Sequence, residues 1–359
     1  MKKLKLVSLF SGAGGLDIGL EAAGFQTVFA NDVVAPCCET LKDNLPHHPK
    51  VVCADVQTLS GKDILAAIGE ERGNVALLAG GPPCQAFSVF GRRKGRDDPR
   101  GRMVYEYFRL LDEIAPQSFV FENVFGLLTV EHGDVFKLVK EQLENPSERL
   151  HYDISVFRLE AADYGVPQFR DRIIIIGSRN GNVVAEIPKL TPENSESSTL
   201  RQRTVADALR GLPPPEGLFP ANHTGRVHSE RIKRRYAELK PGERDHHTRI
   251  NKLDLTKPSF TIICGSNNGG GKGHVHPTEP REVTPRESAR IQTFPDWWKF
   301  NGKGRVVIQQ VGNAVPPLLA FAIGNALRKQ LFGMNPIPLK TGLRAMGQEH
   351  LFPELFDEV

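Results

Sequence analysis

The chain has 359 residues, enough to bury a large core, and its composition is ordinary for a globular protein. Its net charge of +4 permits nucleic-acid binding without requiring it. Five cysteines with no Cys-x-x-Cys spacing exclude a disulfide framework and a zinc-type metal site from the expectation. The amino terminus contains no long apolar segment, so we expect no signal peptide and no membrane span, and a soluble protein of the reducing cytoplasm.

The first segment predicts a strand, a glycine loop and a helix. Residues 4–10 form the strand, Ser11-Gly12-Ala13-Gly14-Gly15 form the loop, and apolar spacing from Leu16 predicts the helix. Such a loop lets backbone amides approach a ligand. The loop lacks the full Gly-x-Gly-x-x-Gly spacing and a Walker lysine, which argues against dinucleotide or ATP phosphates.

Acidic side chains follow the next two predicted strands. Residues 27–30 lead to Asp32, and residues 51–54 lead to Asp55. Carboxylates after two consecutive strands suit an adenosine-containing ligand without phosphate. The alternative is that each acid is a helix cap or a turn residue.

A cysteine follows the apolar run 75–79, which predicts a buried parallel strand closed by Gly80-Gly81-Pro82-Pro83. Functional side chains concentrate in loops at the carboxyl ends of such strands, so Cys84 is a candidate nucleophile. A small buried thiol is the alternative. The segment 85–101 is rich in Gly, Arg and Lys, and would either close over a polyanion or be an exposed loop without function.

The following elements bring further polar groups to the same edge. A helix is expected over 103–114 and another over 135–143, with strands at 118–121, 152–159 and 173–176. Glu122 follows one strand, on the side of Cys84 if both strands are parallel. Gln168, Arg170 and Arg172 alternate, so an extended segment would point all three to one face. That set suits a phosphate and a base edge, or else an ion-paired sheet rim.

The segment from about 180 to 278 differs from the rest of the chain. It is rich in Pro, Gly, Ser, Arg and His and shows little periodicity, which predicts an inserted, irregular domain with a basic excess. A solvated surface is the alternative explanation for that charge. Beyond it, Thr284 is expected to cap a helix, and a later helix with a broad apolar face follows Val311-Gly312-Asn313-Ala314-Val315-Pro316-Pro317. The polar tail beyond Gly333 is expected to be only partly ordered.

Taken together, these segments resemble the C5-cytosine DNA methyltransferase family of the bacterial restriction-modification type. The resemblance rests on ordered motifs: Phe10-x-Gly12-x-Gly14, Asp32, Asp55, Gly81-Pro82-Pro83-Cys84-Gln85, Glu122-Asn123-Val124, Gln168-x-Arg170-x-Arg172, Arg286-Glu287-x-x-Arg290-x-Gln292-x-Phe294-Pro295 and Gly312-Asn313-Ala314-Val315-Pro316-Pro317.

The resemblance implies an α/β fold of the class I S-adenosylmethionine-dependent methyltransferase type. This is a Rossmann-like mixed sheet with helices on both faces, plus a smaller irregular target-recognition domain. The expected divisions are a catalytic and cofactor-binding core over 1–180, the target-recognition domain over 181–300, a return to the core over 301–333 and a tail over 334–359. The helix after Asn313 is expected to pack beside the first helix.

The resemblance also implies roles for individual residues. Cys84 would add to carbon 6 of a flipped cytosine, Glu122 would hold ring nitrogen 3, Arg172 would contact the base carbonyl and Arg170 the nearby backbone. The implied S-adenosylmethionine site contains Phe10, Gly12, Gly14, Leu16, Asp32, Val33, Asp55, Val56, Pro82, Asn313 and Val315. The implied DNA contacts are Gln85, Ser88, Arg92, Arg93, Gln168, Arg226, Arg231, Arg234, Arg235 and Arg249. Asp32 replaces the glutamate often found at its position, which shortens its reach to the ribose.

The expected partners are double-stranded DNA and a cognate restriction endonuclease, with the chain acting as a monomer. Three alternatives compete with this prediction. Relatives that methylate cytosine in transfer RNA carry a Cys-Phe-Thr tripeptide, which this chain lacks. An inactive DNA-binding regulator would be expected to have lost Cys84, Glu122 or an arginine. A dinucleotide oxidoreductase leaves the Pro-Pro-Cys and Gly-Asn-Ala-Val-Pro-Pro segments unexplained.

Overall fold

A computed structural model describes residues 3–83, 102–128, 133–190, 201–215, 219–262, 264 and 272–356. The predicted positions Cys84, Gln85, Ser88, Arg92 and Arg93 lie outside the described residues.

A seven-stranded sheet forms the larger part of the molecule, with strand order β3-β2-β1-β4-β5-β7-β6. Strands β1 to β5 are parallel, whereas β7 runs antiparallel to both β5 and β6. The sheet is therefore mixed, as expected. The strands are β1 (Leu4–Leu9), β2 (Phe25–Asp32), β3 (Lys50–Cys53), β4 (Leu77–Gly80), β5 (Ser118–Val124), β6 (Asp153–Glu160) and β7 (Asp171–Ser178).

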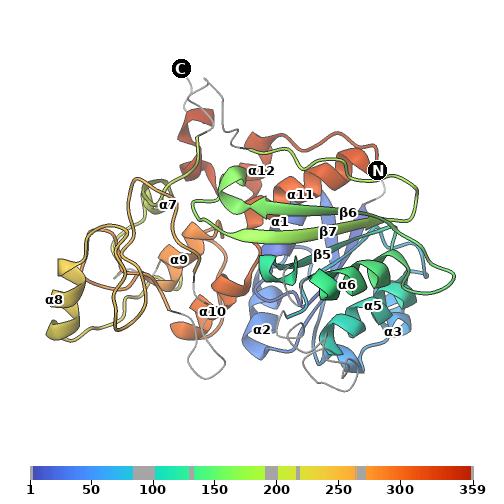
Figure 1. The fold of residues 1–359 in the computed structure, drawn as a ribbon, viewed down its shortest axis with the longest axis horizontal. Helices are drawn as coiled ribbons and strands as arrows, with labels where there is room; N and C mark the ends of the chain where they lie inside the picture. The colour runs from blue at the N-terminus through green and yellow to red at the C-terminus, as the bar shows by residue number, and fades with distance from the viewer. Residues whose placement is uncertain are drawn as a thin grey trace.

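Helices cover both faces of this sheet (Figure 1). One face packs against α1 (Gly15–Ala22), α2 (Ala35–Asn44) and α11 (Pro317–Gln330). The other packs against α3 (Gly61–Ile68), α5 (Arg102–Ile114) and α6 (Asp134–Glu144). The remaining helices are α7 (Val205–Leu209), α8 (Glu230–Glu238), α9 (Pro285–Ile291), α10 (Arg305–Asn313) and α12 (Leu339–Ala345).

Alternation of side chains divides the core into two layers. In β7, Ile174 and Ile176 join the layer under α1 and α11, whereas Ile173 and Ile175 join the layer under α5 and α6. This is the period of two that a strand buried on both faces requires. The continuous apolar runs in the sequence therefore mark the centre of the sheet.

The helix after Asn313 returns to the first helix, as expected. Helices α11 and α1 pack closely, and a Cβ on Gly19 would lie 2.1 Å from the carbonyl oxygen of Pro317. The 26-residue segment that contains α10 and α11 is long and apolar enough to cross a membrane, but 83% of its most apolar window is buried inside the protein. These helices are therefore core helices.

The region around α8 extends away from the sheet (Figure 1). We call the described residues from 219 to 283 the α8 lobe. It has a small separate cluster of Tyr236, Ile250 and Val275. Leu253, Ile262 and Val283, however, belong to the main core. A separate target-recognition domain over 181–300 stays a prediction.

The tail beyond Gly333 differs from the expectation of partial order. Helix α12 and the short turns after it bury Leu343, Met346, Leu351 and Phe352 against the main core. A Cβ on Gly165 would lie 2.6 Å from the ring of Phe352. These apolar residues lie in or beside one short helix and two isolated turns, so no long periodic pattern marks them in the sequence.

Candidate active site

The predicted catalytic residue Glu122 lies at the carboxyl ends of β4 and β5. These strands are parallel, with Gly80 paired to Phe121, so the loop after β4 lies beside Glu122. Asn123 donates a hydrogen bond from Nδ2 to the carbonyl of Pro82 at 3.0 Å. A Cβ on Gly81 would lie 2.5 Å from Glu122 Oε2. A side chain at position 81 would therefore displace the Glu122 carboxylate from its present position.

Arg172 pairs with the same carboxylate from the neighbouring antiparallel strand. Its Nε lies 2.7 Å from Glu122 Oε1, and both side chains are largely but not fully buried. The antiparallel register of β5 and β7 sets Val124 opposite Arg172 and so brings the two groups together. A carboxylate and a guanidinium side by side offer one acceptor and several donors to a polar ring.

Gln168, Arg170 and Arg172 all point inward, as alternation predicts, while the intervening Phe169 is 43% exposed. Their partners differ, however. Arg170 donates from Nη2 to the carbonyls of Gly312 at 2.7 Å and Ala314 at 3.0 Å. Burial and the nearby charge of Arg172 lower the pKa of Arg170 to about 9. Arg170 thus holds a protein loop in this structure.

The predicted DNA contact of Gln168 stays a prediction, and in this structure its side chain is occupied within the protein. Gln168 is fully buried, its Nε2 donates to Gln292 Oε1, and its Oε1 accepts a hydrogen bond from the Ile262 amide at 3.1 Å. Both ends of its amide are occupied inside the protein. Its partners lie far away in the sequence, which is why alternation alone could not identify them.

The glycine loop forms an open cradle at the end of β1. Phe10 has a φ of 52° and Gly12 one of 54°, and no atom lies within 4 Å of a Cβ placed on Gly12. A non-glycine residue at positive φ costs energy and is enriched at functional sites. Gly14 and Gly15 instead lie tight against the protein, since a Cβ on Gly15 would be 2.2 Å from the Val315 carbonyl oxygen. The loop is therefore open on one side and fixed on the other.

Both predicted adenosine carboxylates also act as caps. Asp32 accepts hydrogen bonds from the amides of Gly12 at 2.8 Å and Val34 at 2.9 Å, and burial raises its pKa. Asp55 accepts one from the Gln57 amide at 2.9 Å. Each carboxylate oxygen retains a free lone pair after one such bond. The capping role is thus present, and it leaves room for a ligand.

The other predicted cofactor residues include both exposed and buried side chains. Val33 is 66% exposed beside Asp32, and Asn313 is exposed at the end of α10. Leu16, Val56, Pro82 and Val315 are buried, so their side chains support the walls of the site. An open glycine loop, an exposed apolar valine and two capped carboxylates fit an adenosine-containing group of the S-adenosylmethionine kind.

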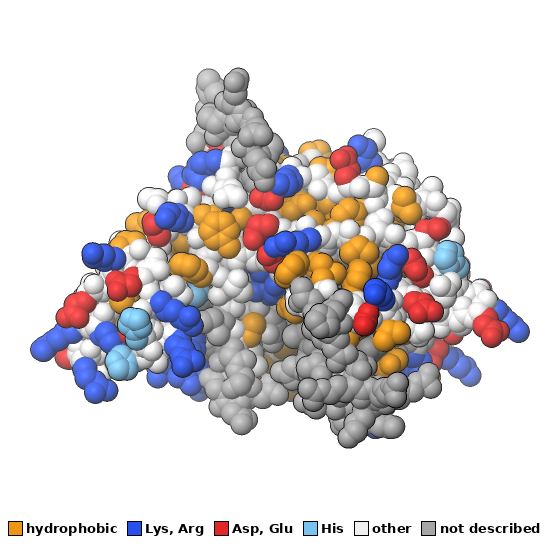
Figure 2. Space-filling view, viewed as in Figure 1, with side chains coloured by type: hydrophobic (Ala, Val, Ile, Leu, Met, Phe, Trp, Pro, Cys, Tyr) orange, Lys and Arg blue, Asp and Glu red, His pale blue; other side chains and the backbone are white. Residues whose placement is uncertain are grey.

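The predicted basic contacts on the α8 lobe also differ in exposure. Arg231, Arg234 and Arg249 are exposed, and Arg226 is exposed but paired with Glu282 at 3.4 Å. Arg235 Nε instead lies 2.6 Å from Oδ1 of the buried Asp245. Figure 2 shows basic side chains at the lobe end of the molecule with acidic ones between them. DNA contacts by these arginines stay predictions.

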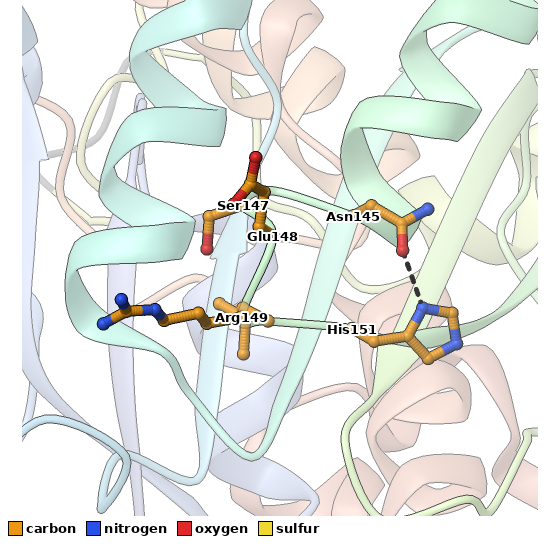
Figure 3. A pocket seen from close by; sticks show the side chains of 6 residues that line it. Asn145, Ser147, Glu148, Arg149 and His151 are labelled. Atoms are coloured by element: carbon orange, nitrogen blue, oxygen red, sulfur yellow. Dashed lines mark hydrogen bonds between the residues drawn. The ribbon is translucent and has the colours of Figure 1, made fainter.

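A surface hollow lies away from this site. A cavity of about 460 Å³ is lined by one loop, from Asn145 to His151, in which Asn145 Oδ1 lies 2.9 Å from His151 Nδ1 (Figure 3). The loop precedes β6, whose first residue, Asp153, pairs with Ser178, and Ser178 pairs with Ser118 at the start of β5. The hollow therefore lies at the amino-terminal end of β5, opposite to the end that carries Glu122.

The strand order and the site define a class I methyltransferase fold. The family model of C-5 cytosine-specific DNA methylases matches residues 4–329, so the chain belongs to that family. It is a DNA cytosine-5-methyltransferase, and enzymes of this family use S-adenosylmethionine as methyl donor.

Relatives and solved structures agree with this assignment. The chain is 33% identical to the type II methyltransferase M.XorII of Xanthomonas oryzae, covering 90% of this chain and 84% of the relative. It is 34% identical to M.MthTI of Methanothermobacter thermautotrophicus, covering 92% and 99%. A DNA modification methyltransferase encoded within an Escherichia coli prophage superposes with a TM-score of 0.72 at 27% identity, covering 92% and 99% of the two chains.

Proposed function

We propose that the chain methylates carbon 5 of a flipped cytosine within a short, specific sequence of double-stranded DNA, through a covalent adduct with Cys84. The observation that carries this proposal is the Arg172–Glu122 pair beside the loop that leads to Cys84. Bound S-adenosylmethionine would supply the electrophilic methyl group.

The protein's own groups have complementary tasks in this reaction. The Cys84 thiolate adds to carbon 6, which makes carbon 5 nucleophilic toward the methyl group. Glu122 holds or protonates ring nitrogen 3 as electrons move into the ring, and Arg172 orients the base carbonyl. Loss of the carbon 5 proton and departure of the Cys84 sulfur then regenerate the enzyme. Because the target atoms are stacked inside a duplex, the base must leave the helix first.

We further propose that the enzyme works as a cytoplasmic monomer beside a restriction endonuclease that cleaves the same site. Support comes from the relatives, which are type II methyltransferases. The transfer RNA and inactive-regulator alternatives are not favoured, because the match to the DNA methylase family spans nearly the whole chain. Likeness to the Schizosaccharomyces pombe Dnmt2 methyltransferase, at 17% identity and a TM-score of 0.62, concerns the fold alone.

The decisive experiment is bisulfite sequencing of genomic DNA from a host without cytosine methylation that expresses this chain. Unconverted cytosines confined to one short context would support the proposal and reveal the recognised sequence. Complete conversion, with soluble protein that binds S-adenosylmethionine, would contradict it.

The covalent step needs its own test. Cys84→Ser should abolish methylation while retaining DNA binding, and 5-fluorocytosine at the target should trap a covalent complex with the wild type only. Normal turnover by Cys84→Ser, or methylation without trapping, would overturn the adduct.

A further inference from the structure

A buried cluster of polar side chains lies between the predicted cytosine pocket and the predicted cofactor site. Gln292 Nε2 donates to the Ala314 carbonyl at 2.6 Å, and Gln292 Oε1 accepts from Gln168 Nε2. The Ala314 carbonyl also accepts from Arg170 Nη2. Gln168, Arg170 and Gln292 are at most 1% exposed. The cluster is therefore closed to solvent.

One end of this cluster reaches the predicted base pocket. Gln168 and Arg170 belong to the segment that continues into Arg172, and Arg172 pairs with Glu122. Only one residue separates Arg170 from Arg172. A displacement of the Arg170 backbone would thus move the guanidinium that lies against Glu122.

The other end reaches the predicted cofactor wall. The carbonyls that Arg170 and Gln292 bind belong to Gly312 and Ala314, on either side of the exposed Asn313. The next residue, Val315, lies against Gly15 of the glycine loop. Thr293, which follows Gln292, accepts a hydrogen bond from the Leu318 amide at 3.1 Å. The neighbour of Gln292 is therefore bonded to the first turn of α11, which follows the same loop.

We propose that Gln292 is a positioning residue that couples occupancy of the cofactor site to the geometry of the cytosine pocket. This inference rests on the proposed function, since it assigns those two sites. Gln292 is fully buried, so its role would be to position other residues and not to contact either ligand. Through Gln168 it fixes the 312–315 loop to the segment that leads to Arg172. Because the cluster is closely packed, ordering of the loop by a bound cofactor would also order the Arg172 side.

The coupling can be measured as a ratio of DNA affinities. The DNA is a duplex that contains the sequence context identified by bisulfite sequencing, with 2-aminopurine at the target position. Its affinity for the wild type would be measured with and without S-adenosylhomocysteine. We expect the wild type to bind about 5- to 150-fold more tightly with S-adenosylhomocysteine, the usual range for coupled sites. Gln292→Glu cannot donate to Ala314, and Gln292→Met keeps the length without polar atoms. In both variants the ratio should fall below about 3-fold, while each ligand still binds alone.

A matched control separates positioning from general stability. Gln310 is also a buried glutamine that bridges two segments, with Oε1 accepting from Thr40 Oγ1 at 2.9 Å and Nε2 donating to the Asn301 carbonyl at 2.6 Å. Gln310→Met should keep the wild-type ratio. A wild-type ratio near one, an unchanged ratio in the Gln292 variants, or an equal loss in Gln310→Met would overturn the proposal.

A measurement on the wild type covers the case in which the Gln292 variants do not fold. S-adenosylhomocysteine alone should slow hydrogen exchange at backbone amides of 168–172 as well as at 312–315. Protection confined to 312–315 would contradict the coupling. This test uses no DNA, so its failure is distinguishable from absence of methylation in the bisulfite experiment.

Discussion

The seven-stranded sheet with the helices α1, α2, α3, α5, α6 and α11 that cover it, here called the sheet half, and the α8 lobe are stabilised by different interactions. The sheet half buries continuous apolar layers on both faces of seven strands. The α8 lobe has a cluster of three buried apolar residues and depends on polar contacts, such as Arg235 with Asp245 and Lys252 Nζ with the Tyr236 carbonyl. Apolar burial is non-directional, whereas hydrogen bonds are lost when one partner is removed. Single polar substitutions should therefore affect the two regions differently.

The junction between the two regions should give the largest effect. Arg286 is fully buried in α9 and donates to the carbonyls of Ala221 at 2.9 Å, Pro295 at 2.7 Å and Trp298 at 2.6 Å. Arg286→Met leaves three buried carbonyls without this partner, so the free energy of unfolding should fall by about 3 kcal/mol or more. Urea unfolding measures it.

Lys257→Met is the matched control for Arg286→Met. Lys257 is 71% exposed and lies 3.9 Å from Asp254, so its loss should change the free energy of unfolding by less than about 0.5 kcal/mol. A similar small change in Arg286→Met would show that the junction does not depend on these hydrogen bonds.

Asp17, a buried carboxyl of α1, should cost stability when it is ionised. Burial raises the pKa of Asp17 to about 6 from 3.8. Between these values this carboxyl binds more protons in the folded state than in the unfolded state, so the contribution of Asp17 to stability should fall as pH rises from about 4 to about 6 and then level off. Asp17→Asn lacks this penalty and should be more stable than the wild type by about 2 to 3 kcal/mol at pH 8.

Thermal unfolding at pH 4 and pH 8 tests the Asp17 prediction. The advantage of Asp17→Asn should largely disappear at pH 4, where the folded wild type is also neutral at this position. Glu39→Gln, at an exposed position of α2, should show no such pH dependence. An Asp17→Asn variant less stable than the wild type at pH 8 would mean that the carboxylate is needed.

The strands could be predicted because their apolar runs are local features of the sequence. All seven predicted strands are present, as are the helices over 103–114 and 135–143 and the Thr284 cap, which forms a reciprocal capping box with Glu287. Helix α12 was not predicted, because its buried residues contact segments distant in sequence. The same holds for the Gln168–Gln292 contact.

The candidate site could be predicted in part for the same reason. Strand ends locate Glu122, Asp32 and Asp55, and parallel pairing brings the loop after β4 to Glu122. What each side chain contacts depends on residues elsewhere in the chain. The Gly312 and Ala314 carbonyls, for example, accept hydrogen bonds from Arg170, and these partners could not be predicted from alternation alone.

A polar contact within the α8 lobe should have a smaller and more local effect. Asp245 accepts hydrogen bonds from the Thr248 amide at 2.7 Å and from its hydroxyl, and it pairs with Arg235. Asp245→Asn should cost about 1 to 2 kcal/mol of local stability, because the substitution removes the negative charge that binds these three donor groups. Limited proteolysis should cleave the lobe faster, while affinity for S-adenosylhomocysteine stays unchanged. Equal loss of cofactor affinity would show that lobe and sheet act as one unit.

The smallest effect on stability is expected at the exposed arginines of α8. Arg231 is solvent-exposed, so Arg231→Ala should change the free energy of unfolding by less than about 0.5 kcal/mol. If Arg231 contacts a DNA phosphate, the slope of log K against log salt should fall by about one unit, with similar losses for target and non-target duplexes. Lys62→Ala, at an exposed position of α3, is the control and should leave that slope unchanged. A loss confined to the target duplex would instead assign Arg231 to base recognition, because phosphate contacts position the protein without distinguishing sequence. An unchanged slope would move the DNA-binding surface away from this face of α8.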